Sequence, residues 1–177
     1  MTKQAKRKST REAKDADPNT PLHHAPISLF RRLYQIATAA SAEVVQAENL
    51  IPLEYGVLLR LHANPGVDQN TLANLLALDR TTTSSVVFKL EQRGLIERGI
   101  NDADRRARTL HLTAKGEAIR ARLRPATAAA QERIWSVLSA SERKQVIAML
   151  LRVLDANQAY MRLGAGRRKR SKNKSSP

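Results

Sequence analysis

The sequence predicts a mainly α-helical fold with one small β-hairpin. Apolar residues recur at helical spacing through most of the middle of the chain, and Gly, Pro and Asp signals separate these periodic segments. Only one pair of short stretches has the composition of strands, and it flanks a charged segment. We expect five regions along the chain: a tail at 1–20, a helix at 26–50, a compact module at 51–116, helices at 117–163 and a tail at 164–177.

Basic residues exceed acidic ones by a wide margin. The 177 residues include 31 Lys and Arg against 16 Asp and Glu, a formal net charge of +15. More than half of this excess lies in residues 1–20 and 164–177, which contain almost no apolar side chains. We therefore expect both ends to be disordered basic tails. The excess of positive charge favours a polyanionic partner.

The first two helices are marked by proline. The first begins after Pro26 and carries apolar residues at helical spacing over roughly 22 residues. The second opens at Pro52, because proline is tolerated in the first turn of a helix, and the run Asn64-Pro65-Gly66 ends it.

A pair of shorter helices follows, each with an aspartate at its start. Asp68 is the expected N-cap of the third helix, and Asp79 caps a fourth from about Arg80 to Arg93, which Gly94 terminates. The residues of the fourth helix that follow the inward period are Thr83, Val87 and Leu90.

The remaining elements are a hairpin and two helices. Residues 95–98 and 108–112 are the predicted strands, with the charged segment 101–107 between them. Thr113 caps a helix expected to reach Val137 and Leu138, with a kink at Pro125. The box 139–142 starts the last helix.

This order of elements is that of a winged helix-turn-helix flanked by N- and C-terminal dimerisation helices. In such a module the second helix of the pair enters the major groove of DNA and the hairpin reaches the neighbouring minor groove. The outward face of the fourth helix carries hydroxyls, which serve base edges or phosphates, and the hairpin tip carries arginines. The residues expected to contact DNA are Arg80, Thr81, Thr82, Ser84, Ser85, Phe88, Lys89, Asp104, Arg105, Arg106 and Arg108.

Each of these assignments has a plainer alternative. The hydroxyls of the fourth helix could form an ordinary polar surface, and the charges of the tip could form a solvated cluster. Phe88 either meets a thymine methyl group or packs on the adjacent hairpin or helix. In the hairpin, Asp104 stands two residues before Arg106 and can hold its guanidinium by a charge-assisted hydrogen bond.

Several classes of protein are excluded or disfavoured. The chain has no cysteine, which rules out disulfides, thiolate zinc sites and thiol redox sensing. It has no secretory leader and no run of about 18 apolar residues, so we expect a cytoplasmic protein with no membrane partner. It has no Ser/His/Asp or Cys/His arrangement, phosphate loop or metal-ligand cluster, so we expect neither an enzyme nor a cofactor.

Four motifs resemble the MarR family of bacterial regulators. They are the entry to the fourth helix at 78–82, its exit and the first strand at 90–98, the Asp-x-Arg of the hairpin at 104–106, and the Leu-Thr-x-x-Gly at 112–116. The resemblance implies a homodimer with intertwined first and last helices, bound to a pseudo-palindromic operator. Such proteins are usually repressors released by a small molecule. The apolar faces of the flanking helices independently favour a helical partner, because one small module cannot cover them.

The resemblance also implies a ligand and a site for it. Effectors in the family are often aromatic carboxylates or phenolic compounds, and in some members aromatic acyl-CoA thioesters, bound between the dimerisation helices and the DNA-binding lobe. The corresponding residues are His23, His24, Arg31, Arg32, Tyr34 and Trp135. The arginine pair could equally form a solvated or DNA-facing surface. His23 and His24 are not expected to bind metal, since no Cys, Asp or Glu stands nearby at ligand spacing.

Two features set this chain apart from many relatives. Many relatives carry Arg at the position of Ser85 and an acidic or polar residue at the position of Phe88. The residues expected to read the bases therefore differ from those of many relatives. The long basic tails support an alternative function, an architectural DNA-binding protein that binds largely without sequence preference.

Overall fold

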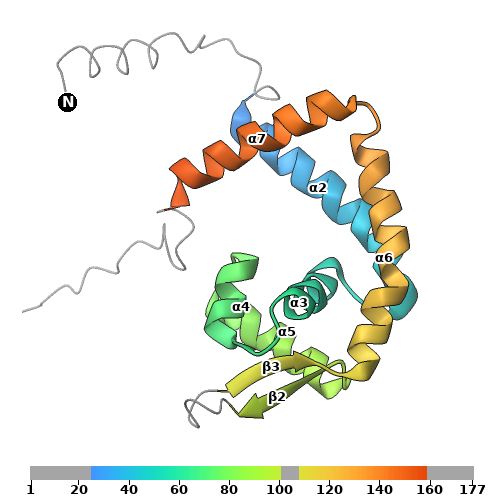
Figure 1. The fold of residues 1–177 in the computed structure, drawn as a ribbon, viewed down its shortest axis with the longest axis vertical. Helices are drawn as coiled ribbons and strands as arrows, with labels where there is room; N and C mark the ends of the chain where they lie inside the picture. Colours follow the sequence, from blue (N-terminus) through green and yellow to red (C-terminus); the bar gives the residue numbers. More distant parts are fainter. Residues whose placement is uncertain (1–24, 101–107, 159–177) are drawn as a thin grey trace, which may run out of the picture. The chain divides into compact units, whose positions relative to one another are not determined.

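The computed structural model describes residues 25–100 and 108–158 (Figure 1). The chain divides after Ala39 into two compact units, and the boundary falls within the first described helix, α2 (Pro26–Val45). The predicted tails at 1–20 and 164–177 and the hairpin segment 101–107 lie outside the described residues.

Helix α2 ends earlier than the sequence predicts. After Val45 a single turn of 3-10 helix, η2 (Gln46–Glu48), leads to Asn49, which adopts the left-handed conformation with φ 54°. Asparagine tolerates this conformation better than most residues and so permits the change of direction before the next helix. The large apolar side chains of α2 that are exposed are Ile27, Leu29, Phe30, Leu33, Tyr34 and Ile36.

The core of the second unit is built on three helices. They are α3 (Pro52–Ala63), α4 (Gln69–Leu76) and α5 (Arg80–Gln92), which pack together beside the sheet (Figure 1). Pro52 starts α3 as predicted, and the Glu54 carboxylate accepts a hydrogen bond from the backbone N–H of Ile51 at 3.1 Å. The largest fully buried side chains are aliphatic except for Thr83: Val45, Val57, Leu58, Leu61, Leu72, Thr83, Val87, Leu90, Leu95, Ile96 and Leu110.

The sheet has three antiparallel strands in the order β1-β3-β2. The predicted hairpin strands are β2 (Ile96–Ile100) and β3 (Arg108–Leu112), with Ile96 opposite Leu112. The strand β1 (Val67–Asp68) is an addition that the sequence did not predict. It consists of two residues held by pairing with β3, Val67 opposite Leu110. Two residues are too few to show the alternation of apolar and polar side chains from which strands are predicted.

Two helices complete the described chain, α6 (Ala114–Trp135) and α7 (Ala140–Ala156). Helix α6 was predicted to include Val137 and Leu138, and this is wrong: it ends at Trp135, and Val137 is 84% exposed. The chain must leave the helical conformation here because Ser139, the N-cap of α7, is extended. Pro125 lies within α6 without ending it.

Helix α7 begins with the predicted capping box. The Ser139 hydroxyl accepts a hydrogen bond from the backbone N–H of Glu142, whose carboxylate accepts one from the backbone N–H of Ser139 at 2.8 Å. No side chain of α7 is buried. None of the described helices combines the length and the apolar character that a membrane crossing requires.

Candidate nucleic-acid interface

Two aspartates fix the starts of the helix pair, as predicted. The Asp68 carboxylate accepts the backbone N–H groups of Asn70 and Thr71 at 2.7 and 2.9 Å, and that of Asp79 accepts the backbone N–H of Thr82 at 2.9 Å. Chiefly the Thr71 N–H, aided by that of Asn70, holds the pKa of Asp68 below its ordinary value. Each cap satisfies donors that would otherwise lack partners at a helix start.

The turn between α4 and α5 is tight. Ala77 adopts the left-handed conformation with φ 53°, and the Leu78 N–H donates to the Ala73 carbonyl at 2.9 Å. On α5 the Thr83 hydroxyl is fully buried and donates to the backbone carbonyl of Asp79 at 2.8 Å. Because this bond satisfies the hydroxyl, Thr83 can sit among apolar side chains. The buried face of α5 comprises Thr83, Val86, Val87 and Leu90.

The opposite face of α5 is open to solvent. Its exposed residues are Arg80, Thr81, Ser85, Phe88, Lys89 and Gln92, and all except Gln92 are among those predicted to contact DNA. A shallow hollow of about 290 Å³ runs beside this face, lined in part by Thr81, Ser85 and Lys89 and on its other side by Ile51 and Leu53. A helix that presents hydroxyls and a cation on one uncovered face has the surface that a major groove requires.

Two of the predicted contact residues are already engaged inside the protein. The Thr82 hydroxyl donates to the Asp79 carboxylate at 2.9 Å. The Gln69 side-chain amide donates to the Ser84 hydroxyl at 2.6 Å, a contact between α4 and α5. Both side chains are only partly exposed. Their hydroxyls therefore stabilise the helix pair, whereas Thr81 and Ser85 stand more freely on the outer face.

Phe88 is largely open to solvent, with a side chain that is 58% exposed. Because residues 101–107 lie outside the described residues, contact with a thymine methyl group and packing on the hairpin both stay predictions. Phe88 lies one residue after the fully buried Val87, which turns inward to the core.

Arg93, at the C-terminal end of α5, connects three segments that are distant in the sequence. Its guanidinium donates to the backbone carbonyls of Glu48 and Asn49, both at 2.9 Å, and to the Glu54 carboxylate at 3.4 Å. Lys115 of α6 in turn donates to the Arg93 carbonyl at 2.9 Å. The planar guanidinium suits several acceptors at once. These bonds hold the end of α5 against the turn before α3.

Sequence reasoning missed the role of Arg93. A basic residue near a helix C-terminus is ordinary, because it complements the helix dipole. Nothing in the local pattern indicates that its acceptors come from residues 48–54, some 40 positions earlier.

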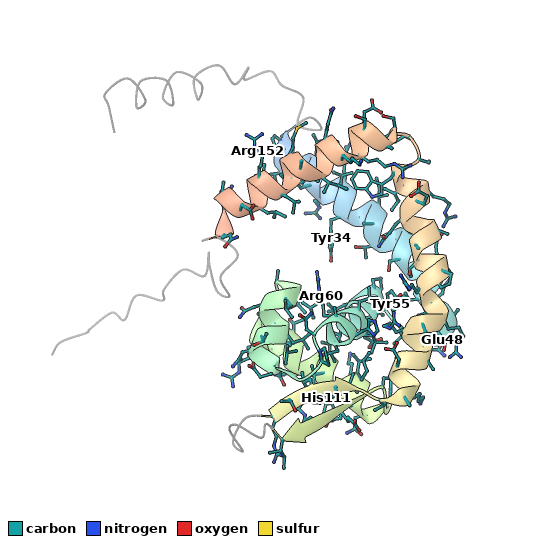
Figure 2. All side chains as sticks on the ribbon, in the orientation of Figure 1. Tyr34, Glu48, Tyr55, Arg60, His111 and Arg152 are labelled. Carbon is teal, nitrogen blue, oxygen red and sulfur yellow. The ribbon has the colours of Figure 1, made fainter. Side chains whose placement is uncertain are left out.

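Helix α6 is held to α3 by two polar contacts. Figure 2 shows Tyr55 extending from α3 toward α6, where its hydroxyl lies 3.2 Å from that of Thr127 in the buried interior. Near the start of α6, Glu117 accepts from Arg120 and lies 3.0 Å from the His62 ring. The Arg120 guanidinium, chiefly through its hydrogen bond, keeps the pKa of Glu117 below its ordinary value. These contacts connect the helix-turn-helix to the long helix.

The hairpin is described only at its base. Arg108 is exposed at the start of β3, opposite Ile100, which is 58% exposed. The predicted tip contacts Asp104, Arg105 and Arg106 lie outside the described residues, and their roles stay predictions.

Comparison with known proteins agrees with this architecture. A family model described as MarR family matches residues 48–107, which include the helix-turn-helix and β2. A putative transcriptional regulatory protein for the hcr operon of Thauera aromatica is 33% identical over 132 residues, 75% of each chain. The chain belongs to the MarR family. Its curated relatives are transcriptional regulators, among them YybA of Bacillus subtilis and HosA of Escherichia coli.

Solved structures of MarR-family regulators share the fold. The PcaV transcriptional regulator of Streptomyces coelicolor, in complex with its natural ligand, has a TM-score of 0.69 and 33% identity, covering 77% of this chain and 96% of PcaV. The repressor CouR bound to a 23-mer DNA duplex has a TM-score of 0.69 and 30% identity, covering 75% of this chain and 94% of CouR. A further structure, CouR from Rhodococcus jostii RHA1 bound to p-coumaroyl-CoA, has a TM-score of 0.70 and 24% identity, a likeness of fold.

The effector residues inferred from the MarR resemblance are only partly described. Arg31, Arg32 and Tyr34 are exposed on α2, and Trp135 is half-buried at the end of α6. His23 and His24 lie outside the described residues. A cavity formed by this set stays a prediction. Within residues 25–100 and 108–158, no three His, Asp or Glu side chains are grouped so that they could hold a metal ion.

Proposed function

We propose that this chain is a homodimeric, sequence-specific DNA-binding repressor whose α5 helix enters the major groove. The observation that carries the proposal is the uncovered face of α5, where Arg80, Thr81, Ser85 and Lys89 stand on a helix whose opposite face is locked into the core. CouR, a repressor with the same fold and 30% identity, binds a DNA duplex. Cations of this face would contact phosphates, and hydroxyls would meet base edges.

The hairpin supplies the second part of the proposed contact. Arg105, Arg106 and Arg108 would reach the minor groove beside the helix, where a narrow groove attracts arginine. We expect Arg106→Ala to weaken operator binding by about 1 to 3 kcal/mol, the usual range for a specific contact. Unchanged operator affinity would remove Arg106 from the interface.

Footprinting on the DNA upstream of the protein's own gene tests the proposal. Purified full-length protein at near-physiological salt should protect one discrete, pseudo-palindromic site. Half-sites read by a symmetric pair of recognition helices should be one helical turn, about 34 Å, or a multiple of it apart. Uniform protection with no preferred site would contradict a specific regulator.

The distribution of charge favours one alternative, an architectural protein that coats DNA. Residues 1–20 and 164–177 hold more than half of the positive excess, and such tails bind phosphates regardless of sequence. Deletion of residues 1–20 and 165–177 separates the two functions. In a specific regulator the deletion lowers affinity for all DNA about equally and spares the preference for the operator. Loss of the preference together with the tails would favour the alternative.

We further propose that a small aromatic acid or an aromatic acyl-CoA thioester releases the repressor. The basis is likeness alone: PcaV, 33% identical, has been solved with its natural ligand, and the CouR of Rhodococcus jostii RHA1, 24% identical, with p-coumaroyl-CoA. A thermal-shift screen with aromatic carboxylates and their CoA thioesters tests this, because a ligand at 100 times its dissociation constant adds about 2.7 kcal/mol of stability. An effector should hold the two recognition helices at a spacing other than about 34 Å and lower operator affinity. A ligand that stabilises the protein yet leaves operator affinity unchanged is not the effector.

A further inference from the structure

Phe88 is an unusual residue for the position it occupies. It lies in the third turn of α5, on the open face, and is 58% exposed, while the aliphatic residues of the same helix, Val86, Val87 and Leu90, are buried. An aromatic ring left in water contributes little to stability, because apolar side chains stabilise the folded state through the area that they bury. Its place in the structure is therefore not explained by the core.

The neighbours of Phe88 on this face are polar. Thr81, Ser85 and Phe88 stand at positions i, i+4 and i+7, which form one stripe along a helix. At about 1.5 Å per residue, Phe88 is displaced about 4.5 Å along the axis from Ser85, close to the base-pair step of about 3.4 Å. In a recognition helix that lies along the groove, Phe88 would face a different base pair from Ser85. Phe88 lies two turns after the N-terminus of α5, and its side chain is longer than that of serine or threonine. The ring could therefore reach the bases from this more distant turn.

The major groove offers one apolar feature to such a ring. Guanine, adenine and cytosine present hydrogen-bonding groups at their edges, whereas thymine adds a C5-methyl group beside its O4 acceptor. A phenyl ring has no donor or acceptor, so pressing it against the polar edges would remove water from groups and leave them unpaired. Against a methyl group the same burial is favourable.

We propose that Phe88 selects thymine at one position of each operator half-site by packing against its C5-methyl group. This rests on the proposed function, since it assumes that α5 lies in the major groove of a specific site. Phe88 is then a specificity-determining residue, and Lys89, the next exposed residue, contributes a sequence-independent phosphate contact beside it.

Replacing thymine by deoxyuridine tests the proposal, because the exchange removes only the methyl group and keeps base pairing and O4. In the footprinted operator each thymine is replaced in turn, symmetrically in both half-sites. We expect replacement at one thymine per half-site to weaken binding of the unaltered protein about fourfold for each methyl, the size expected for one buried carbon. Phe88→Ala should bind the thymine and deoxyuridine operators at that position equally. Phe88→Leu, which keeps an apolar contact, should retain part of the difference.

Ser85→Ala is the matched control on the same face. It alters a hydroxyl four positions from Thr81 and should leave the discrimination between thymine and deoxyuridine at the Phe88 position intact. Because Phe88 is exposed, its alanine variant should unfold at the same temperature as the unaltered protein, which separates a loss of specificity from a loss of structure.

The outcomes distinguish the thymine preference from the function on which it rests. A protected operator at which no deoxyuridine replacement matters would overturn the thymine preference alone. So would a methyl dependence that persists in Phe88→Ala. The absence of any discrete protected site would overturn the proposed function, and the preference with it.

Discussion

Asp68 shows how a single side chain organises the entry to the DNA-facing helices. Its carboxylate accepts two backbone N–H groups and the Thr71 hydroxyl, the last at 3.0 Å, so one residue satisfies two of the four N–H groups left open at the start of α4. Asp68 also pairs with Thr109 through β1. The start of the helix-turn-helix and the sheet are thereby tied at the same residue.

We expect Asp68→Ala to lower the free energy of unfolding by about 1 kcal/mol, the typical loss for an N-cap. The effect should depend on pH. Because the folded-state pKa of Asp68 is depressed, the charge adds stability that is fully present above the unfolded-state pKa, about 3.9, and is lost as the pH falls through the lower folded-state pKa. Chemical denaturation of both proteins between pH 3 and pH 7 measures the difference.

Glu97→Gln is the control for this prediction, since it removes an exposed carboxylate from β2 that caps no helix. The difference in unfolding free energy between Asp68→Ala and the unaltered protein should shrink at low pH. A difference that stays constant down to pH 3 would show that the N-cap does not depend on the charge of Asp68.

At the scale of elements, the contact between α5 and the turn before α3 depends on Arg93. Two carbonyls and the Glu54 carboxylate, whose side chain is 9% exposed, converge on one guanidinium. We expect Arg93→Ala to lower the free energy of unfolding by about 1.5 to 3 kcal/mol, because the two carbonyls and the Glu54 carboxylate lose a charged donor. Arg93→Lys should recover only part, since lysine lacks the planar fork. Urea denaturation measures all three proteins.

Arg98→Ala provides the comparison. Arg98 pairs with Glu91 at 3.0 Å on the surface, an interaction of a kind worth about 0 to 1 kcal/mol. If both alanine variants lost the same small amount of unfolding free energy, the hydrogen bonds of Arg93 would contribute no more than a surface ion pair.

The start of α6 approaches Leu95, the residue before β2, so closely that only glycine fits. A Cβ at Gly116 would lie 2.0 Å from the backbone oxygen of Leu95, and backbone cannot rotate away as a side chain can. We expect Gly116→Ala to destabilise the protein by about 1 to 3 kcal/mol through overpacking, measured by thermal unfolding. This also explains in physical terms the glycine of the Leu-Thr-x-x-Gly motif.

Gly56→Ala is a suitable control, because a Cβ there would meet only Leu76 at an ordinary 3.8 Å. Helix propensity favours alanine at both sites, so a Gly116→Ala protein as stable as Gly56→Ala would refute the close approach.

At the scale of the molecule, local signals explain what the sequence could predict. The caps at Asp68, Asp79 and Ser139 and the stop at Gly94, with φ 67°, each depend on residues within a few positions. The strand β1 and the Arg93 network depend on partners about 40 positions away, and no local pattern records them. The end of α6 at Trp135 was missed because the apolar period continued to Leu138. Of the candidate interface, the open face of α5 was predictable, whereas the internal bonds of Thr82 and Ser84 were not.

The last helix, α7, exposes large apolar side chains of the kind found where subunits pack together. On α7 no side chain is buried, and its exposed large apolar residues are Ile147, Met149, Leu151, Val153 and Leu154. A patch of this kind is rare on a monomer and typical of a helix that packs on a partner. In the proposed homodimer, α7 would contribute to the contact between subunits.

We expect Leu151→Glu to convert the dimer to a monomer, because it places an unpaired charge in the apolar contact. Operator affinity should fall about 100-fold, since each half-site would then bind alone and the gain from linking two sites is lost. Sedimentation and operator titration measure the two effects. Ser141→Glu adds the same charge in the first turn of α7, where its neighbours on the helix surface are Lys144 and Gln145, and it should leave both unchanged. A Leu151→Glu protein that stays dimeric would show that α7 does not hold the subunits together. One that dissociates yet keeps full operator affinity would show that DNA recognition does not need a pair of recognition helices.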